Sequence, residues 1–187
     1  MPFWGIRWRV VLLRTYSKTL DMAVDPGTLH FFCGKMAAGK STKAVELQEV
    51  YSAVLLSEDD WLRYLFPEEI KNLPDYIHYS ARLKPLLKSH VQALLKSGLS
   101  VVMDFPGNTK RQRAWFREIY QEYGFPHVLH YVEASDETCL KQLAERSNDL
   151  PEDAPFTSEE AFHLVNRYFQ VPGADEGFNI KVHVRSL

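Results

Sequence analysis

The segment from Gly34 to Ser41 has the residue types and spacing of a phosphate-binding loop. Its sequence, GKMAAGKS, fits the pattern G-x-x-x-x-G-K-[ST] at every fixed position. The glycines let the backbone turn its N–H groups inward, and the following helix adds its positive dipole end. Lys40 can reach the β- and γ-phosphates of a nucleotide, and the Ser41 hydroxyl can bind Mg²⁺. We expect the following residues to contact the nucleotide: Gly34, Lys35, Met36, Ala37, Ala38, Gly39, Lys40, Ser41 and Thr42.

A run of acids follows the apolar segment 53–57, which we expect to be a strand. This run is Glu58, Asp59 and Asp60. In sheets of parallel strands covered by helices, ligands bind beyond the carboxyl ends of the strands. A carboxylate at Asp59 can therefore take the proton from a hydroxyl that attacks the γ-phosphate. Asp60 is expected to cap the helix that follows.

Asp104 ends a second apolar strand, Val101-Val102-Met103. An acid in that position can orient Mg²⁺ and its water molecules beside the phosphate-binding loop. The alternative is an acid that caps the turn before Pro106.

Arg146 follows a predicted helix and precedes a polar segment, 147–157, that contains two prolines. An arginine on a mobile lid can swing over the transferred phosphoryl group and neutralise its oxygens. The alternative is a solvated arginine that the helix dipole favours at this end.

Lys110, Arg113 and Arg117 recur at helical spacing and share one face of a predicted helix. Such a stripe is usually solvated. Because it comes just after Asp104, we expect Arg113 to meet a substrate anion or a carboxylate.

Short, continuously apolar strands alternate with helices along the chain. This pattern is typical of a parallel sheet covered on both faces, which makes a three-layer α/β fold. The strands are expected at 28–33, 53–57, 100–104, 127–132 and 179–184, and the helices at 40–50, 60–66, 75–97, 109–123, 136–146 and 158–169. His127 and His130 lie at odd spacing on one strand, so they face opposite ways and cannot share a metal.

Composition limits the class of protein. A chain of 187 residues with 45% hydrophobic and 25% charged residues is ordinary for one globular domain. The net charge of −2 provides no strong basic field for nucleic acid, so any such binding would be local. Two cysteines and apolar runs of only four or five residues indicate a reduced, cytoplasmic protein without a membrane span.

The first 26 residues are expected to be an extension before a single domain at 27–187, with a lid at about 140–160. Residues 1–21 are rich in arginine and poor in acids. Three interpretations stay open: upstream sequence before a true start at Met22, an ordered extension, or a targeting segment.

These residues together give the chain a resemblance over about residues 27–183. It resembles the P-loop kinase-like ATPases of the AAA_33 type, a group similar to polynucleotide kinase, chloramphenicol phosphotransferase and the zeta toxins. The motifs that carry the resemblance are Gly34–Ser41, Ser57–Trp61, Asp104 with Asn108-Thr109, Arg113–Trp115, Cys139–Asn148, and Phe169–Phe178 with Pro172 and Glu176.

The resemblance implies a five-stranded sheet in the order 2-3-1-4-5 with a helical lid. It implies that ATP and Mg²⁺ bind, that Asp59 is the catalytic base and that Arg146 is the lid arginine. In polynucleotide kinases an arginine closely follows the acid pair. Here Leu62 has the nearest position and Arg63 comes one residue later, which departs from that pattern.

The sequence therefore predicts a kinase that transfers the ATP γ-phosphate to a hydroxyl of a small molecule. Lys40, Asp59 and Arg146 are the expected catalytic residues, with Mg²⁺ on Ser41 and Asp104. Asp59, Trp61, Arg63 and Arg113 are the expected acceptor contacts. The alternatives are a polynucleotide 5′-hydroxyl kinase, a zeta-toxin-like sugar-nucleotide kinase, or a switch protein that binds ATP and phosphorylates nothing. The acceptor, the preferred nucleotide base and the oligomeric state stay open.

Overall fold

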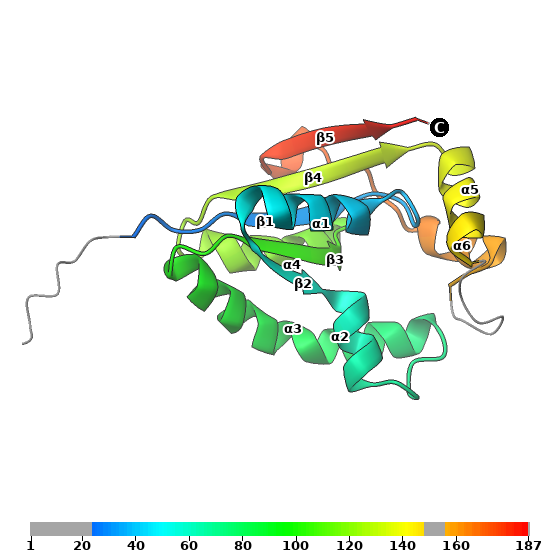
Figure 1. Cartoon of the computed structure of the whole chain (residues 1–187), viewed down its shortest axis with the longest axis horizontal. Coiled ribbons are helices and arrows are strands. Elements are labelled where there is room, and N and C mark those ends of the chain that lie inside the picture. The colour runs from blue at the N-terminus through cyan, green and yellow to red at the C-terminus, as the bar shows by residue number, and fades with distance from the viewer. Residues whose placement is uncertain (1–23, 148–155, 187) are drawn as a thin grey trace, which may run out of the picture.

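A five-stranded parallel sheet forms the centre of the computed structural model, which describes residues 24–147 and 156–186 (Figure 1). Its strands lie in the order β2-β3-β1-β4-β5, and every neighbouring pair is parallel. This confirms the expected fold and strand order. The strands are β1 Leu29–Cys33, β2 Val54–Ser57, β3 Val101–Pro106, β4 His127–Ala134 and β5 Ile180–Arg185.

Helices cover both faces of the sheet because successive strand residues point to opposite sides. Phe31 packs in one apolar cluster with residues of α3 and α4, and Phe32 packs in the other with residues of α1, α5 and α6. These clusters account for the three layers. The helices are α1 Lys40–Tyr51, α2 Glu58–Leu65, α3 Leu73–Lys96, α4 Lys110–Gln121, α5 Asp136–Ser147 and α6 Glu159–Asn166, followed by the short 3₁₀ helix η1 Ala174–Glu176.

Helix α2 begins two residues earlier than the sequence predicted. Its N-cap is Ser57, whose hydroxyl accepts a hydrogen bond from the Asp60 N–H at 3.3 Å. The expectation that Asp60 caps this helix is therefore wrong, because the serine at the end of β2 already does so. As a consequence, Asp59 lies in the first helical turn.

Strand β3 continues two residues beyond its expected end at Asp104. Its register against β1 shifts there, since Phe31 pairs with Met103 and Phe32 pairs with Pro106. On the other side Asp104 pairs with Ser57 of β2. Asp104 thus lies inside a strand and next to the start of α2.

The expected N-terminal extension lies mostly outside the described residues, as do residues 148–155 of the expected lid. In the described parts of the chain, the helices are all too short or too polar to cross a bilayer.

Candidate functional site

Two asparagine side chains fix the phosphate-binding loop between β1 and α1. Asn108, which follows β3, accepts a hydrogen bond from the Gly34 N–H at 3.0 Å. Asn166, at the end of α6, accepts one from the Met36 N–H, also at 3.0 Å. At Gly39 the backbone has φ of 95°, and a Cβ would come within 1.9 Å of the Arg185 guanidinium. Glycine is favoured there by its positive φ, whereas the Arg185 side chain could move aside for a Cβ.

Lys40 begins α1 and folds back over the loop. Its ammonium group donates hydrogen bonds to the carbonyl oxygens of Gly34 at 2.8 Å and Lys35 at 2.7 Å. Burial lowers the pKa of Lys40, and the nearby charges of Asp104 and Asp59 oppose that shift. The loop carbonyls thus hold the ammonium group where it can turn toward an anion.

Ser41 and Asp104 lie together beside this lysine. Burial raises the pKa of Asp104, and a hydrogen bond from the Ser41 hydroxyl opposes the shift. Ser41 is exposed at the start of α1, and Asp104 is half-buried in β3. The two oxygen ligands expected for Mg²⁺ therefore meet.

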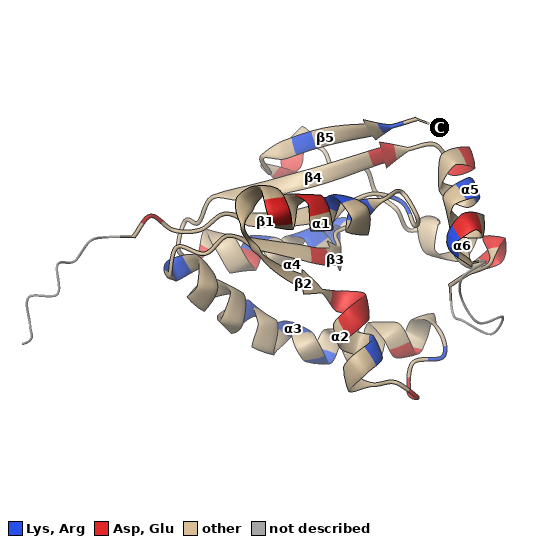
Figure 2. Cartoon of the chain, in the orientation of Figure 1, with Lys and Arg blue, Asp and Glu red and all other residues tan. Residues whose placement is uncertain are grey.

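Asp59 lies exposed in the first turn of α2 and reaches the same region. Its charge acts on both Lys40 and Asp104, and its Oδ1 accepts a hydrogen bond from the Tyr76 hydroxyl at 3.0 Å. Figure 2 shows the red acidic segment at the start of α2 below the end of β3. The structure thus brings together four expected residues: Lys40, Ser41, Asp59 and Asp104.

The other expected acceptor contacts on α2, Trp61 and Arg63, differ from Asp59 in their burial and in their partners. Trp61 is half-buried and packs against the larger apolar cluster. Arg63 is exposed, forms an ion pair with Asp60 at 2.7 Å and lies over the Tyr64 ring. Their contact with an acceptor stays a prediction.

Helix α5 brings the expected lid next to the loop. Asp136, in its first turn, forms an ion pair with Lys35. Arg146 lies exposed in the last turn, just before residues that the structure does not describe. Its approach to the phosphates stays a prediction.

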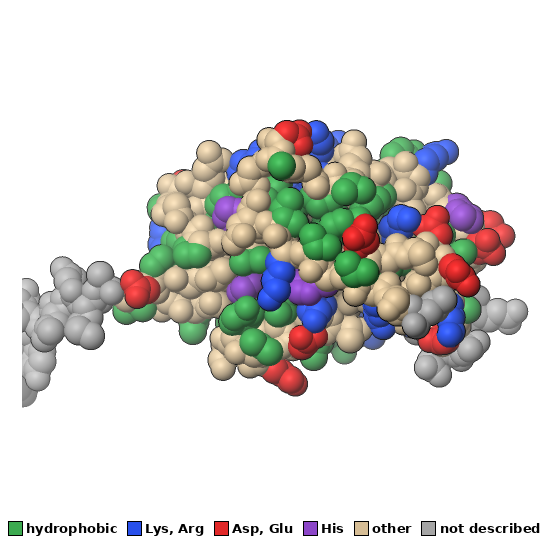
Figure 3. Space-filling model, turned by 90° about the horizontal axis from the view of Figure 1, so that it is seen from above, with side chains coloured by type: hydrophobic (Ala, Val, Ile, Leu, Met, Phe, Trp, Pro, Cys, Tyr) green, Lys and Arg blue, Asp and Glu red, His purple; other side chains and the backbone are tan. Residues whose placement is uncertain are grey.

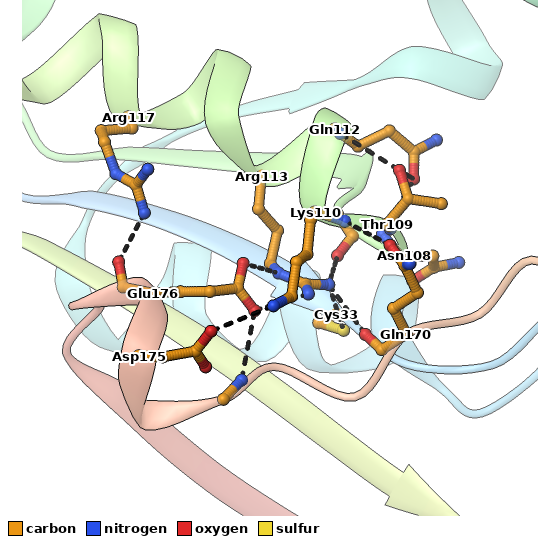
Figure 4. Close-up of polar contacts among 12 residues, drawn as sticks. Cys33, Asn108, Thr109, Lys110, Gln112, Arg113, Arg117, Gln170, Asp175 and Glu176 are labelled. Atoms are coloured by element: carbon orange, nitrogen blue, oxygen red, sulfur yellow. Dashed lines mark hydrogen bonds and ion pairs between the residues drawn. The ribbon is translucent and has the colours of Figure 1, made fainter.

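Arg113 has a structural position rather than a place at an accessible surface (Figure 4). Its side chain is 0% exposed and binds both Glu176 carboxylate oxygens, through Nε at 2.8 Å and Nη2 at 2.7 Å. Its Nη1 donates to the carbonyl oxygens of Gly107 and Gln170, each at 2.9 Å. The expected contact with a carboxylate is thus present, and the expected contact with a substrate anion is wrong because the guanidinium is enclosed.

The whole basic stripe of α4 binds the segment around η1. Lys110 pairs with Asp175 at 3.0 Å, and Arg117 donates to the carbonyl oxygen of Glu176 at 2.5 Å. The stripe therefore holds the chain between α6 and β5, and through Gly107 it also supports the neighbouring Asn108 that binds the loop.

A cavity of about 350 Å³ lies on the other side of the loop, between α1 and the ends of β4 and β5. Figure 3 shows the molecule from the side on which β5 lies uppermost in Figure 1. The polar residues that β5 contributes to this cavity are not among the predicted site residues. Their position at the carboxyl end of the last strand is a signal that could have indicated them. The lining residues are Gly39, Thr42, Lys43, Glu46, Val132, His183, Val184 and Arg185.

Three histidines form a hydrogen-bonded row across the sheet and reach this cavity. His30 Nδ1 lies 3.0 Å from His130 Nε2, and His130 Nδ1 lies 2.9 Å from His183 Nε2. Burial lowers the pKa of His30 to about 4 and that of His130 to about 3. These two imidazoles are neutral near pH 7, so each can donate one hydrogen bond and accept another.

The comparisons with known proteins agree with this architecture. Residues 29–172 match the model of an AAA domain family, AAA_33. No curated protein is significantly similar to the chain in sequence. Many solved structures share the fold, and the three described next have sequence identities below 25%, so they show the fold alone.

The first of these structures is the APS kinase CysC of Mycobacterium tuberculosis in complex with AMPPNP and APS. It is 16% identical over 86% of this chain and 91% of its own, with a TM-score of 0.58. Kti12 of Chaetomium thermophilum, in complex with ADP-AlF3, is 14% identical over 84% and 88%, with a TM-score of 0.60. A sugar kinase from Janibacter sp. HTCC2649 is 13% identical over 85% and 86%, with a TM-score of 0.56.

Proposed function

The chain belongs to the AAA domain family AAA_33, and on that premise we propose that it transfers the γ-phosphate of ATP to a hydroxyl of a small molecule. The observation that carries the proposal is the position of Asp59. An exposed carboxylate, outside the phosphate-binding loop, lies within electrostatic reach of Lys40 and Asp104. A protein that only binds ATP has no need of a free base there.

The loop supplies the nucleotide site in this proposal. Its backbone N–H groups and the start of α1 bind the phosphates, and Lys40 leaves the Gly34 and Lys35 carbonyls to meet their charge. The cavity beside Gly39 is the proposed place of the nucleoside. Arg146 is proposed to approach from α5 and to help exclude water.

Ser41 and Asp104 fit a magnesium site, because a hydroxyl and a carboxylate that already contact one another are oxygen ligands of the preferred kind. When bound, Mg²⁺ supplies positive charge that neutralises the phosphate oxygens. The residues of this chain do the rest. Lys40 orients the phosphates, and Asp59 takes the proton from the attacking hydroxyl as its oxygen bonds to phosphorus.

Local charge favours a small acceptor over a polymer. Two exposed acids, Asp59 and Asp60, lie in the first turn of α2, and the net charge of the chain is −2. A nucleic-acid backbone requires clustered cations, whereas Arg63 on this helix is paired with Asp60. Trp61 and Arg63 are the proposed acceptor contacts on α2.

The test uses γ-labelled ATP, Mg²⁺, the purified chain and a cell extract separated into small molecules and nucleic acids. We expect label on a small molecule. Asp59→Asn should lower the rate of transfer about 100-fold or more, because a general base contributes about 10² to 10⁴. Binding of ATP should persist. Asp60→Asn is the matched control, since Asp60 pairs with Arg63 on the same turn and should leave transfer close to the parent rate.

Two other results would redirect the proposal. Label on oligonucleotide ends, with binding that falls steeply as salt rises, would establish a nucleic-acid acceptor. Bound ATP with no labelled product, and hydrolysis that Asp59→Asn leaves intact, would establish a switch protein.

A further inference from the structure

Glu58 is a fully buried acid whose two hydrogen-bond donors are both uncharged. Its side chain is 0% exposed, next to the exposed Asp59. Its Oε2 accepts a hydrogen bond from the Tyr76 hydroxyl at 2.7 Å, and its Oε1 accepts one from the Ser80 hydroxyl at 2.6 Å. Both donors come from α3. A carboxylate in such a place lacks the cation that normally compensates its burial.

The Tyr76 hydroxyl also contacts Asp59, so a single phenol proton lies between two carboxyl groups. The phenol oxygen lies 2.7 Å from Glu58 Oε2 and 3.0 Å from Asp59 Oδ1. A phenol carries one proton, so it can donate to only one of the two carboxyl groups. Two such short oxygen contacts need two protons. The second proton must therefore lie on a carboxyl group.

The surroundings of the two carboxyl groups favour Glu58 as the holder of the second proton. Burial raises the pKa of Glu58, and the neighbouring charge of Asp59 raises it further, while the two hydroxyl donors and Lys84 oppose the shift. Lys84 lies over the Trp115 ring at 5.3 Å, and no direct ion pair with Glu58 is found among the described residues. Asp59 is exposed to water, which stabilises its ionised form.

We propose that Tyr76 is a positioning residue for Asp59, within a directed chain in which protonated Glu58 donates to Tyr76 and Tyr76 donates to Asp59. The inference rests on the proposed function, in which Asp59 is the base. This chain of hydrogen bonds occupies Asp59 Oδ1 and leaves Asp59 Oδ2 free to accept a proton from the acceptor hydroxyl. As the acceptor oxygen bonds to the γ-phosphorus, its O–H bond breaks and the proton moves to Asp59 Oδ2, while the bond from the γ-phosphorus to the bridging oxygen breaks and ADP leaves.

The direction of these hydrogen bonds should reverse at high pH. When Glu58 loses its proton, Tyr76 donates to the buried carboxylate, because that charge has no water to compensate it. Asp59 then loses the donor that orients it. The charged groups around this unit are Lys84 on α3, Asp60 on α2, Lys40 on α1 and Asp104 on β3. Transfer should therefore fall at alkaline pH.

Glu58→Gln separates this mechanism from simple packing. The glutamine amide always carries donor hydrogens, so it can donate to Tyr76 and accept from Ser80 at any pH. Tyr76→Phe removes the hydroxyl and keeps the ring contact with Phe156, whose centroid lies 5.9 Å away. Tyr79→Phe is the matched control on the same helix, because the Tyr79 ring packs on Phe66 at 4.3 Å and not on the acids.

The first experiment needs no acceptor. Carbon-13 NMR of the nucleotide-free chain, labelled in its Asp and Glu carboxyl groups, follows Glu58 and Asp59 as pH rises. We expect Glu58 to be protonated at pH 7, and its titration step to appear in the Asp59 resonance too. That second appearance should vanish in Tyr76→Phe and persist in Tyr79→Phe. A Glu58 ionised at pH 7, or an Asp59 resonance that ignores it, would overturn the inference.

The second experiment measures transfer against pH. Tyr76→Phe should lower kcat about 10-fold with little change in KM for ATP, since one hydrogen bond to a charged group is lost. Glu58→Gln should move the alkaline limb up by about one pH unit or more. If Asp59→Asn abolishes transfer but Glu58→Gln leaves the limb in place, the inference fails and the function stands. If the NMR coupling is present but Asp59→Asn leaves transfer intact, the proposed function fails instead.

Discussion

The side chains of Glu58 and Glu176 are both largely enclosed, although Glu176 is the more exposed of the two, and their surroundings shift the two pKa values in opposite directions. The hydrogen-bond partners of the Glu58 side chain are two hydroxyl groups, and burial raises its pKa. The Glu176 side chain, 7% exposed, receives two hydrogen bonds from the Arg113 guanidinium, and these lower its pKa. Burial alone therefore favours the neutral acid, and one adjacent cation reverses that preference.

This difference in charge state suits the two acids to different roles, one structural and one in the candidate site. The Glu176–Arg113 pair is permanently charged and joins α4 to η1, so it holds the backbone that supports the phosphate-binding loop through Gly107 and Asn108. Glu58 can hold or release a proton beside Asp59. One acid is suited to fix a structure, and the other is suited to pass a directed hydrogen bond to a reacting group.

Breaking the charged pair should produce the largest effect. Arg113→Met leaves Glu176 buried without a cation and leaves the Gly107 and Gln170 carbonyl oxygens without a donor. We expect the free energy of unfolding to fall by about 4 kcal/mol, measured by urea denaturation. Lys110→Met is the control, because its partner Asp175 is exposed, and it should cost less than about 1 kcal/mol. Equal costs for the two variants would mean that burial does not set the strength of the Arg113 pair.

The row formed by His30, His130 and His183 allows the same comparison for bases, because burial also favours the neutral form of an imidazole. The unfolded chain binds a proton at His30 and His130 below about pH 6.5, whereas the folded chain resists until the pKa values of about 4 and about 3 are approached. The free energy of unfolding should therefore fall as pH decreases from 6.5 to 5. We expect a loss of about 3 kcal/mol by urea denaturation.

Replacing one histidine of the row should flatten this dependence on pH. His130→Asn removes the central imidazole, and His90→Gln removes an exposed one on α3. We expect a shallower slope in the first variant and the parent slope in the second. A parent slope in both would show that the row takes up protons in the folded chain as readily as in the unfolded one.

The sequence predicted the parallel sheet and the loop because these depend on local patterns, whereas the strand order was implied by the resemblance to the AAA_33 group. Continuous apolar strands, a glycine-rich turn and a strand-ending acid are each readable within about ten residues. Lys40, Ser41, Asp59 and Asp104 could be placed together because the carboxyl ends of parallel strands share one edge of the sheet.

Side-chain partners distant in sequence could not be predicted in this way. Arg113 binds Glu176, 63 residues later in the chain, so the sequence could not decide whether Arg113 meets a substrate anion or a carboxylate. Tyr76 finds Asp59 across 17 residues. The histidine row could not be predicted because its members lie on three different strands. The spacing of His127 and His130 along one strand gives no information about neighbours across the sheet.

The smallest effect should be the sharpest test of the comparison, because only its sign matters. A raised pKa means that folded Glu58 keeps a proton which the unfolded chain releases near pH 4.5, so its contribution to the free energy of unfolding is lost as pH rises. Glu58→Gln cannot lose that proton. We expect its free energy of unfolding to rise relative to that of the parent as pH increases from 5 to 8 in urea denaturation. Glu176→Gln should show the opposite trend, because a lowered pKa stabilises the parent above about pH 4.5 and its advantage shrinks as pH falls through the folded value. Slopes of the same sign in the two variants would mean that Glu58, like Glu176, is held as a carboxylate, and the hydrogen-bond chain through Tyr76 could then not be directed toward Asp59.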